Sequence, residues 1–151
     1  MPRPDPLYRW ADRVASRFPT LSRCQARVLA WYSFGMAAAR SGGLDRVAVH
    51  LAASSGAAVD TVRQRLREFY RPARSKRGRS RRELEPEACF GPLLAWVLSG
   101  WGDGPLALAI DPTSLGDRMT VLCVSAVYRS CAVPVAWAVL PANEPGAWNP
   151  H

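Results

Sequence analysis

The sequence predicts an α+β protein, with helices in its first half and an antiparallel sheet in its second half. Apolar residues recur at helical spacing between residues 7 and 70, whereas three apolar runs separated by turn residues occupy residues 106–140. The charge divides in the same way, because 18 of the 20 Lys and Arg residues lie at or before Arg82. We therefore expect two regions, 1–82 and 83–151, with different roles.

The first helices are expected to be amphipathic. Residues 7–18 place apolar side chains on one face and arginines on the other. Pro19 ends this pattern, and either Thr20 or Ser22 is suited to cap a second helix over residues 25–40.

A short helix, a glycine turn and a further helix are expected next. Residues 46–53 give the short helix, and Gly56 lies in the turn, where a positive φ favours glycine. Asp60-Thr61 is expected to cap the following helix, residues 62–70. This order is the outline of a helix-turn-helix.

The last of these helices carries the side chains that are suited to read DNA bases. Arg63, Gln64 and Arg67 are expected on its exposed face, and Arg and Gln donate hydrogen bonds to base edges. The side chains expected to hold the helix to the core are Leu66, Phe69 and Tyr70. The same pattern also fits a helical bundle whose arginines face only solvent.

Residues 71–82 form a basic segment without apolar periodicity. Seven of its twelve residues are Lys or Arg, and none is acidic. We expect a flexible linker whose cations bind phosphates with salt-sensitive, weakly specific affinity. The candidate contacts are Arg71, Arg74, Lys76, Arg77, Arg79, Arg81 and Arg82.

The overall composition favours a polyanionic partner. The net charge is +8 and the pI is about 10.2. A genome that prefers arginine would also raise the charge, but it would not explain the clustering. The four cysteines form no Cys-x-x-Cys pair and only two His are present, which disfavours a zinc site. Without a signal peptide or a long apolar run, a cytoplasmic protein that does not enter a membrane is expected.

The second region is expected to begin with an apolar helix and to continue with three sequential strands. The helix is predicted over residues 89–98, with Pro92 in its first turn. The apolar runs that predict strands are residues 106–110, 120–128 and 132–140. A proline within the third run, Pro134, indicates an edge strand, because proline cannot donate to a sheet ladder.

Asp111 is the one candidate catalytic residue. It follows the first apolar run, and Pro112 is expected to end that strand, so the carboxylate would stand at its tip. If Arg129-Ser130 is a two-residue hairpin loop, Cys123 should lie opposite Ala136. From the spacing alone, Asp111 also fits a turn residue after a strand.

Five short stretches of the second region occur in a fixed order: Ala109-Ile110-Asp111-Pro112-Thr113, Val127-Tyr128-Arg129, Val133-Pro134-Val135-Ala136-Trp137, Leu140-Pro141-Ala142-Asn143 and Pro145-Gly146-Ala147-Trp148. Together they resemble the start of the RNase H-like catalytic domain of DDE transposases from bacterial insertion sequences. The resemblance covers residues 105–150.

The resemblance implies that Asp111 is the first of three acidic ligands that hold Mg²⁺ for DNA cleavage and strand transfer at transposon ends. The family also needs a second Asp on a later strand and a Glu on a late helix, and the sequence reaches His151 before either. The expectation is an N-terminal transposase fragment that is inactive alone. Its implied partners are transposon-end DNA and either a second copy or an intact transposase.

Two other functions fit the same sequence. One is a non-enzymatic DNA-binding protein that occupies transposon ends and regulates transposition. The other is a helical interaction domain followed by a β-hairpin.

Overall fold

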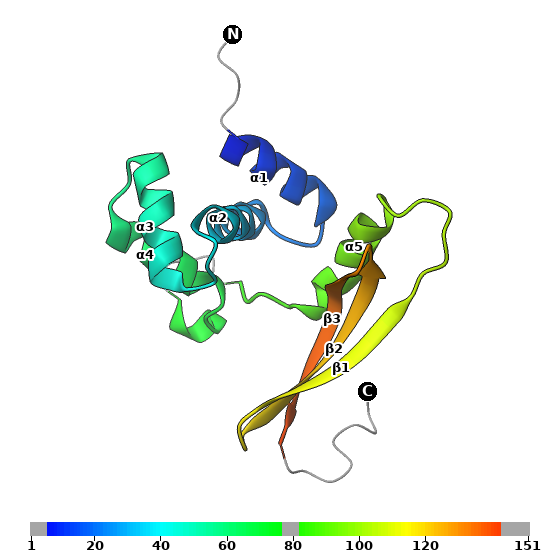
Figure 1. Ribbon diagram of the computed structural model, residues 1–151. Helices are drawn as coiled ribbons and strands as arrows, with labels where there is room; N and C mark the ends of the chain where they lie inside the picture. The colour runs from blue at the N-terminus through cyan, green and yellow to red at the C-terminus, as the bar shows by residue number, and fades with distance from the viewer. Residues whose placement is uncertain (1–5, 77–81, 143–151) are drawn as a thin grey trace. The chain divides into compact units, whose positions relative to one another are not determined.

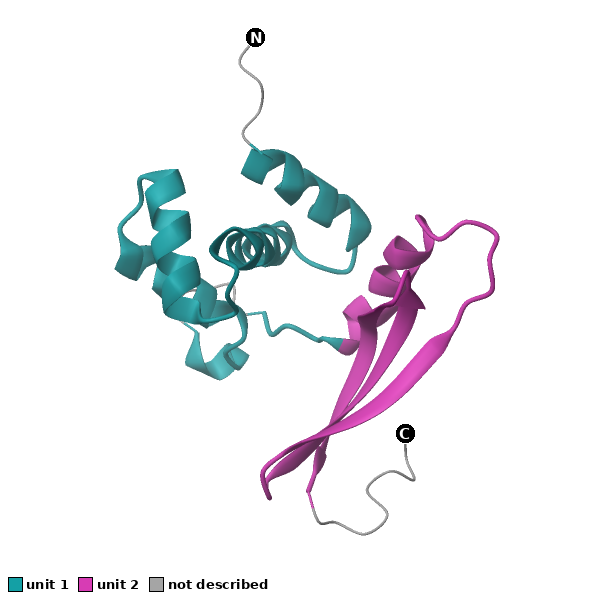
Figure 2. Ribbon diagram, viewed as in Figure 1, with its two compact units in different colours: residues 1–86 teal, residues 87–151 magenta. Residues whose placement is uncertain are grey.

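The computed structural model describes residues 6–76 and 82–142. The chain forms two compact units, residues 1–86 and residues 87–151, a division slightly later than the predicted one (Figure 2). Within the described ranges, the helices come first and a three-stranded antiparallel sheet follows (Figure 1). The predicted α+β class is therefore confirmed.

The first unit begins with α1 (Pro6–Arg17) and α2 (Arg23–Ala39), close to the predicted bounds. Of the two possible caps for α2, Ser22 is the one that the structure uses. Its Oγ accepts a hydrogen bond from the Gln25 N–H at 3.3 Å, and Gln25 Oε1 accepts one from the Ser22 N–H at 3.0 Å. This reciprocal capping box fixes the first residue of α2.

The next helices are α3 (Leu44–Ser55) and α4 (Val59–Phe69), joined by a short turn. Gly56 has a φ of +69° in this turn, as the sequence predicts. The predicted cap at Asp60-Thr61 is wrong, because α4 begins earlier, with Ala58 as an N-cap that makes no side-chain hydrogen bond. Asp60 instead lies in the first turn of α4, where its negative charge interacts favourably with the helix dipole.

The core of the first unit lies where α2 packs against α1, α3 and α4. Helices α2 and α3 approach closely at Gly35, where a Cβ atom would be 2.7 Å from Cγ1 of Val47 and 2.9 Å from Cγ of Leu51. The buried core residues are Leu7, Trp31, Val47, Ala48, Leu51, Ala52, Val62 and Leu66.

Not every predicted core contact of α4 is present. Leu66 is fully buried and Phe69 is half-buried, as expected, but Tyr70 is 55% exposed. The prediction for Tyr70 is wrong because α4 ends at Phe69, so Tyr70 lies beyond the apolar stripe of the helix.

Hydrogen bonds connect the two described ends of the basic segment to each other. It contains a short 3₁₀ helix, η1 (Ala73–Ser75), and the Lys76 ammonium donates to the carbonyl oxygen of Arg82 at 2.6 Å. The Ala73 N–H donates to Oε2 of Glu83 at 3.3 Å. Without apolar periodicity, the segment carried no pattern that would predict this structure at its two flanks. Residues 77–81 lie outside the described ranges.

The second unit consists of α5 (Glu87–Leu98), β1 (Leu108–Leu115), β2 (Met119–Tyr128) and β3 (Cys131–Pro141). The sheet has the order β1-β2-β3, and both pairings are antiparallel (Figure 1). The prediction of three sequential antiparallel strands is confirmed.

Strand β1 does not end at the predicted place. It continues through Asp111 and Pro112, and Pro112 lies opposite Leu122 in the ladder. The prediction is wrong because β1 is at an edge of the sheet, where a strand has no partner on one side and tolerates proline. Pro134 lies in β3 at the other edge, as predicted.

The hairpin between β2 and β3 has the predicted two-residue loop. Arg129 has a φ of 47° and Ser130 a φ of 66°, which fit the two central positions of a type I′ turn.

The register beyond this turn differs from the prediction, because Cys123 lies opposite Trp137 and not opposite Ala136. A bulge next to Ser125 adds one residue, Val135, to β3. Every pair beyond Val135 along β3 is therefore shifted by one position.

Helix α5 packs against β3, with the ring of Phe90 4.7 Å from that of Trp137 in an edge-on arrangement. It begins at Glu87, so Pro92 lies in the helix interior and not in the predicted first turn. None of the side chains of α5 is fully buried. This apolar helix has 12 residues, and none of the helices in the described ranges has the length and apolar character needed to cross a membrane.

Candidate nucleic-acid interface

The positive charge of the chain belongs to the first region. Residues 1–82 contain 18 basic and five acidic residues, which gives a formal charge of +13. Residues 83–151 contain two basic and seven acidic residues, which gives −5, so the two regions add to the total of +8. A polyanion would therefore be attracted to the first region.

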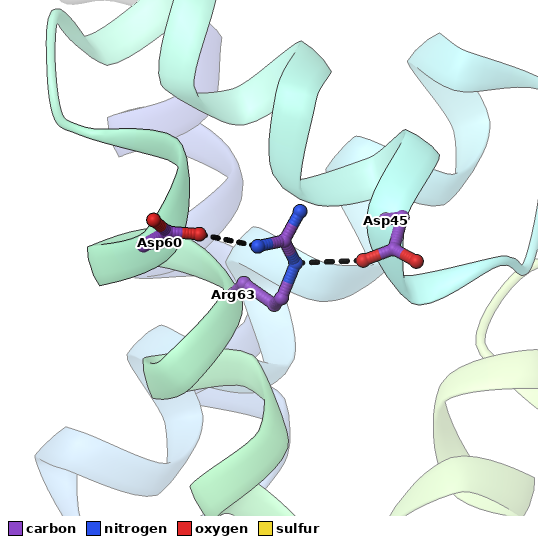
Figure 3. A network of polar contacts seen from close by, with 3 residues as sticks. All are labelled: Asp45, Asp60 and Arg63. Atoms are coloured by element: carbon purple, nitrogen blue, oxygen red, sulfur yellow. Dashed lines mark hydrogen bonds and ion pairs between the residues drawn. The ribbon is translucent and has the colours of Figure 1, made fainter.

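Arg63 is positioned by two carboxylates (Figure 3). Its Nε donates to Oδ1 of Asp45 in α3 at 2.6 Å, and its Nη1 pairs with Oδ1 of Asp60 in α4. The Arg63 side chain is only 31% exposed. The residue therefore links α3 to α4, and its charge is largely balanced within the protein.

Gln64 and Arg67 are the other two predicted base-reading residues of α4. Gln64 is exposed, and its Nε2 donates to Oε1 of Glu68 at 2.8 Å. Arg67 is half-buried and makes no hydrogen bond or ion pair with any residue that the structure describes. Of the two predicted arginines, Arg67 is therefore the one whose guanidinium is more available to a ligand.

The structure describes four of the seven candidate phosphate-binding cations of the basic segment. Arg74 and Arg82 are exposed, and Arg71 and Lys76 are half-buried. The predicted contacts at residues 77, 79 and 81 (Arg77, Arg79 and Arg81) lie outside the described ranges.

Two further arginines flank a buried tryptophan and were not predicted. The guanidinium carbon of Arg65 lies 5.3 Å from the ring centroid of Trp31, and that of Arg27 lies 5.8 Å from it. Trp31 is only 7% exposed. Arg65 is three residues after Val62 and four before Phe69. This spacing could have predicted from the sequence that Arg65 lies beside the apolar stripe of α4.

A cleft of about 430 Å³ opens between the start of α2 and the side of α4. Ser22, Cys24 and Gln25 line it from the start of α2, and Phe69 lines it from α4. We call it the basic cleft, because its charged lining, among the residues that the structure describes, consists of four cations and one acid: Arg23, Arg65, Lys76, Arg82 and Glu68. The sequence predicted Lys76 and Arg82 as phosphate contacts but missed Arg23 and Arg65.

Asp111 lies in the second unit, within β1 and not at its tip. The register places it in a cross-strand row with Cys123 and Trp137, on one face of the sheet. Its carboxylate is exposed, and Oδ2 accepts a hydrogen bond from the Thr113 hydroxyl at 3.3 Å.

The surroundings of Asp111 do not complete a magnesium site. Mg²⁺ prefers six oxygen ligands, and two-metal catalysis needs several carboxylates. The neighbours of Asp111 in the row supply a thiol and an indole ring. Within residues 6–76 and 82–142, no group of three or more His, Cys, Asp or Glu residues is placed to hold a metal ion.

Comparison of the chain with protein-family models, with curated proteins and with solved structures finds no match.

Proposed function

We propose that the chain binds DNA through its first unit, with α3 and α4 acting as a helix-turn-helix. The observation that carries this proposal is the available guanidinium of Arg67 on α4, in a region with a formal charge of +13. Major-groove recognition needs such a donor on a helix that is held rigidly by its neighbours.

The packing of α3 and α4 supports this role. Ala52 of α3 is 5% exposed and Val62 of α4 is 1% exposed, and Gly56 turns the chain between them with a φ of +69°. The ion pair from Arg63 to Asp45 adds a polar link between the two helices. In the proposed complex, Arg63 positions α4, while Gln64 and Arg67 face the bases.

The parent function in this proposal is that of a DDE transposase, with the second unit as the start of an RNase H-like domain. Three antiparallel strands with an Asp on the first strand support this reading. Asp111 would be one metal ligand of such a domain. Since its described neighbours do not complete a site for Mg²⁺, we derive no cleavage step from it.

A second candidate is a DNA-binding protein that occupies transposon ends and regulates transposition without cleaving DNA. It is favoured by the location of the candidate DNA contacts described above, which all belong to the first unit. That unit has its own apolar core, so DNA binding would not require Asp111.

The proposal is tested by fluorescence anisotropy with labelled duplex DNA over a range of salt concentrations. We expect binding at about 50 mM salt that weakens steeply as salt is added, since bound Lys and Arg displace counterions from phosphates. Arg67→Ala should weaken binding by about tenfold, whereas Arg118→Ala, which removes one exposed charge from the second unit, should have little effect. Absence of binding at low salt, or equal effects of the two variants, would refute the proposal.

The two candidates are separated by incubating the chain with DNA and Mg²⁺ or Mn²⁺. Cleavage or strand transfer by the wild-type chain, and its loss in Asp111→Asn, would support the transposase. Salt-sensitive binding to a defined terminal sequence without cleavage would support the regulator.

A further inference from the structure

We propose that the basic cleft is a second DNA contact, which binds backbone phosphates beside the base-reading face of α4. This inference rests on the proposed function, because it assigns a further surface of the same unit to the same ligand. Phosphate contacts of this kind set the position and orientation of a protein on a duplex without reading its sequence.

The four described cations of the cleft come from separate parts of the chain. Arg23 begins α2, Arg65 lies in α4, and Lys76 and Arg82 belong to the basic segment. The fold therefore gathers positive charge that the sequence distributes over about sixty residues. With Glu68 as the one acid among its described lining residues, these residues have a formal charge of +3, and such a concentration of like charge attracts an anion.

Two of these cations are already held by contacts within the protein. The guanidinium carbon of Arg65 lies over the ring of Trp31, 5.3 Å from its centroid, and the ammonium of Lys76 donates to the carbonyl oxygens of Arg82 at 2.6 Å and Phe69 at 3.4 Å. The Nε2 atom of Gln25 donates to the carbonyl oxygen of Glu83 at 3.0 Å, which fixes the end of the basic segment at the same place. Side chains that are ordered before binding lose little conformational entropy when a phosphate arrives.

Arg23 does not stabilise the helix that carries it. It is the first residue of α2, and the first turn of α2 contains no acid. A cation at this end is unfavourable for a helix, because the exposed N–H groups there already carry partial positive charge. An anion in front of the Arg23 guanidinium and these N–H groups would offset this cost.

The cleft lies next to the proposed base-reading residues of α4. Glu68 lines the cleft and also accepts the hydrogen bond from Gln64, one helical turn earlier. The face of α4 that carries Gln64 therefore borders the cleft. A duplex whose bases meet α4 would bring its backbone to the four cations.

The first experiment compares two double variants with equal loss of charge, by anisotropy on the full chain. Arg23→Gln with Arg82→Gln alters two exposed cations of the cleft, and Arg9→Gln with Arg13→Gln alters two exposed cations of α1 that do not line it. We expect the cleft variant to weaken DNA binding at least about tenfold and to reduce the salt slope by about 2, and the α1 variant to change affinity less than about threefold. Thermal unfolding by circular dichroism checks that both variants fold.

A second experiment uses the thiols as reporters and needs no variant. Cys24 lines the cleft and is exposed, whereas Cys131 is an exposed thiol of the second unit. Duplex DNA should slow the alkylation of Cys24 by iodoacetamide, measured by peptide mass spectrometry, and should leave the rate at Cys131 unchanged. A parallel arm with inorganic pyrophosphate, at the same ionic strength, tests whether a small phosphate ligand gives the same protection.

The outcomes separate this inference from the proposed function. If DNA binds and Arg67→Ala weakens binding, but the two double variants behave alike and Cys24 stays reactive, then the basic cleft is not a contact and only the inference fails. If the wild-type chain does not bind DNA, the proposed function fails. Protection of Cys24 by pyrophosphate but not by DNA would overturn the assignment of the cleft to a nucleic-acid backbone.

Discussion

Arg63 and Asp45 join the two helices proposed to form the helix-turn-helix, since Nε of Arg63 donates to Oδ1 of Asp45 at 2.6 Å (Figure 3). The same guanidinium pairs with Asp60 in the first turn of α4. A residue that the sequence suggests as a DNA contact is therefore occupied in holding α4 to α3. Its two acidic partners also place negative charge close to the proposed interface.

Asp45→Asn is expected to raise the affinity for DNA by about two- to fivefold at low salt, because it removes a negative charge and partly releases Arg63. The Asp45 carboxylate is 77% exposed, so the free energy of unfolding should fall by less than about 1 kcal/mol. Asp12→Asn, which removes an exposed charge from α1, is the control for net charge alone. A lower affinity in Asp45→Asn would mean that the ion pair positions α4 for binding and that its loss outweighs the gain in charge.

Glu68→Gln should increase DNA affinity more than Asp45→Asn does. Glu68 is the one acid among the described lining residues of the basic cleft, and an amide oxygen at this position can still accept the hydrogen bond from Gln64. We expect a gain of about three- to tenfold in anisotropy titrations at low salt, and a smaller gain at high salt because counterions screen the charge. If the gain is no larger than that of Asp12→Asn, then Glu68 does not face the bound DNA.

Gly35→Ala is expected to destabilise the first unit. The new Cβ atom would lie 2.7 Å from Cγ1 of Val47 and 2.9 Å from Cγ of Leu51, and both of these side chains are fully buried. Overpacking of this kind lowers the free energy of unfolding by about 1–3 kcal/mol. Replacing glycine by alanine within a helix gains up to about 1 kcal/mol, so the net effect should still be a loss.

Chemical denaturation, followed by circular dichroism of the helices, measures this effect. Gly91→Ala is the matched exchange, since nothing lies within 4 Å of a Cβ atom at Gly91, and it should be tolerated. Equal stability of Gly35→Ala and the wild-type chain would show that α2 and α3 are able to move apart.

Local patterns in the sequence predicted the elements of the fold better than their contacts. The spacing of apolar residues predicted the helices, and the turn residues at Gly56 and Arg129-Ser130 adopt the positive φ values that their positions require. The end of β1 was predicted wrongly because tolerance of Pro112 depends on an edge position, which is a property of the whole sheet. The partner of Cys123 was predicted wrongly because the bulge at Val135 leaves no mark in the apolar pattern.

In the candidate interface, too, the residues were easier to predict than their contacts. The cluster of cations was visible in the sequence, but their partners were not. Arg63 is bound to Asp45, which is 18 residues away, and the guanidinium of Arg65 lies over the ring of Trp31 in another helix. Such pairings depend on how the helices pack, so the sequence alone does not distinguish a cation that is available to DNA from one that is used within the protein.

Cys89 should react more slowly with alkylating reagents than the exposed thiols Cys24 and Cys131. Burial raises the pKa of the Cys89 thiol, and the nearby charge of Glu87 raises the pKa further. A raised pKa means that less of the reactive thiolate is present at a given pH, so the rate should increase only at higher pH. The measurement is the pH profile of iodoacetamide labelling at each cysteine by peptide mass spectrometry.

Glu87→Gln is the matching variant for this prediction. It removes the smaller cause and should shift the Cys89 profile toward lower pH, while burial keeps the pKa above that of an exposed thiol. Identical profiles for Cys89, Cys24 and Cys131 in the wild-type chain would contradict the burial of this thiol.

Asp111→Asn is expected to leave DNA affinity unchanged in the presence of a chelator. Asp111 belongs to the second unit, and among the described residues its carboxylate accepts a hydrogen bond from Thr113 but forms no ion pair. Anisotropy titrations at about 0.15 M salt suit this test, because the screening length is then about 8 Å and the change in net charge has little influence. Asp117→Asn, an exposed residue of the turn after β1, removes the same charge as a control. If Asp111→Asn alters affinity and Asp117→Asn does not, then the part of the sheet around Asp111 takes part in DNA binding, and the first unit is not sufficient for it.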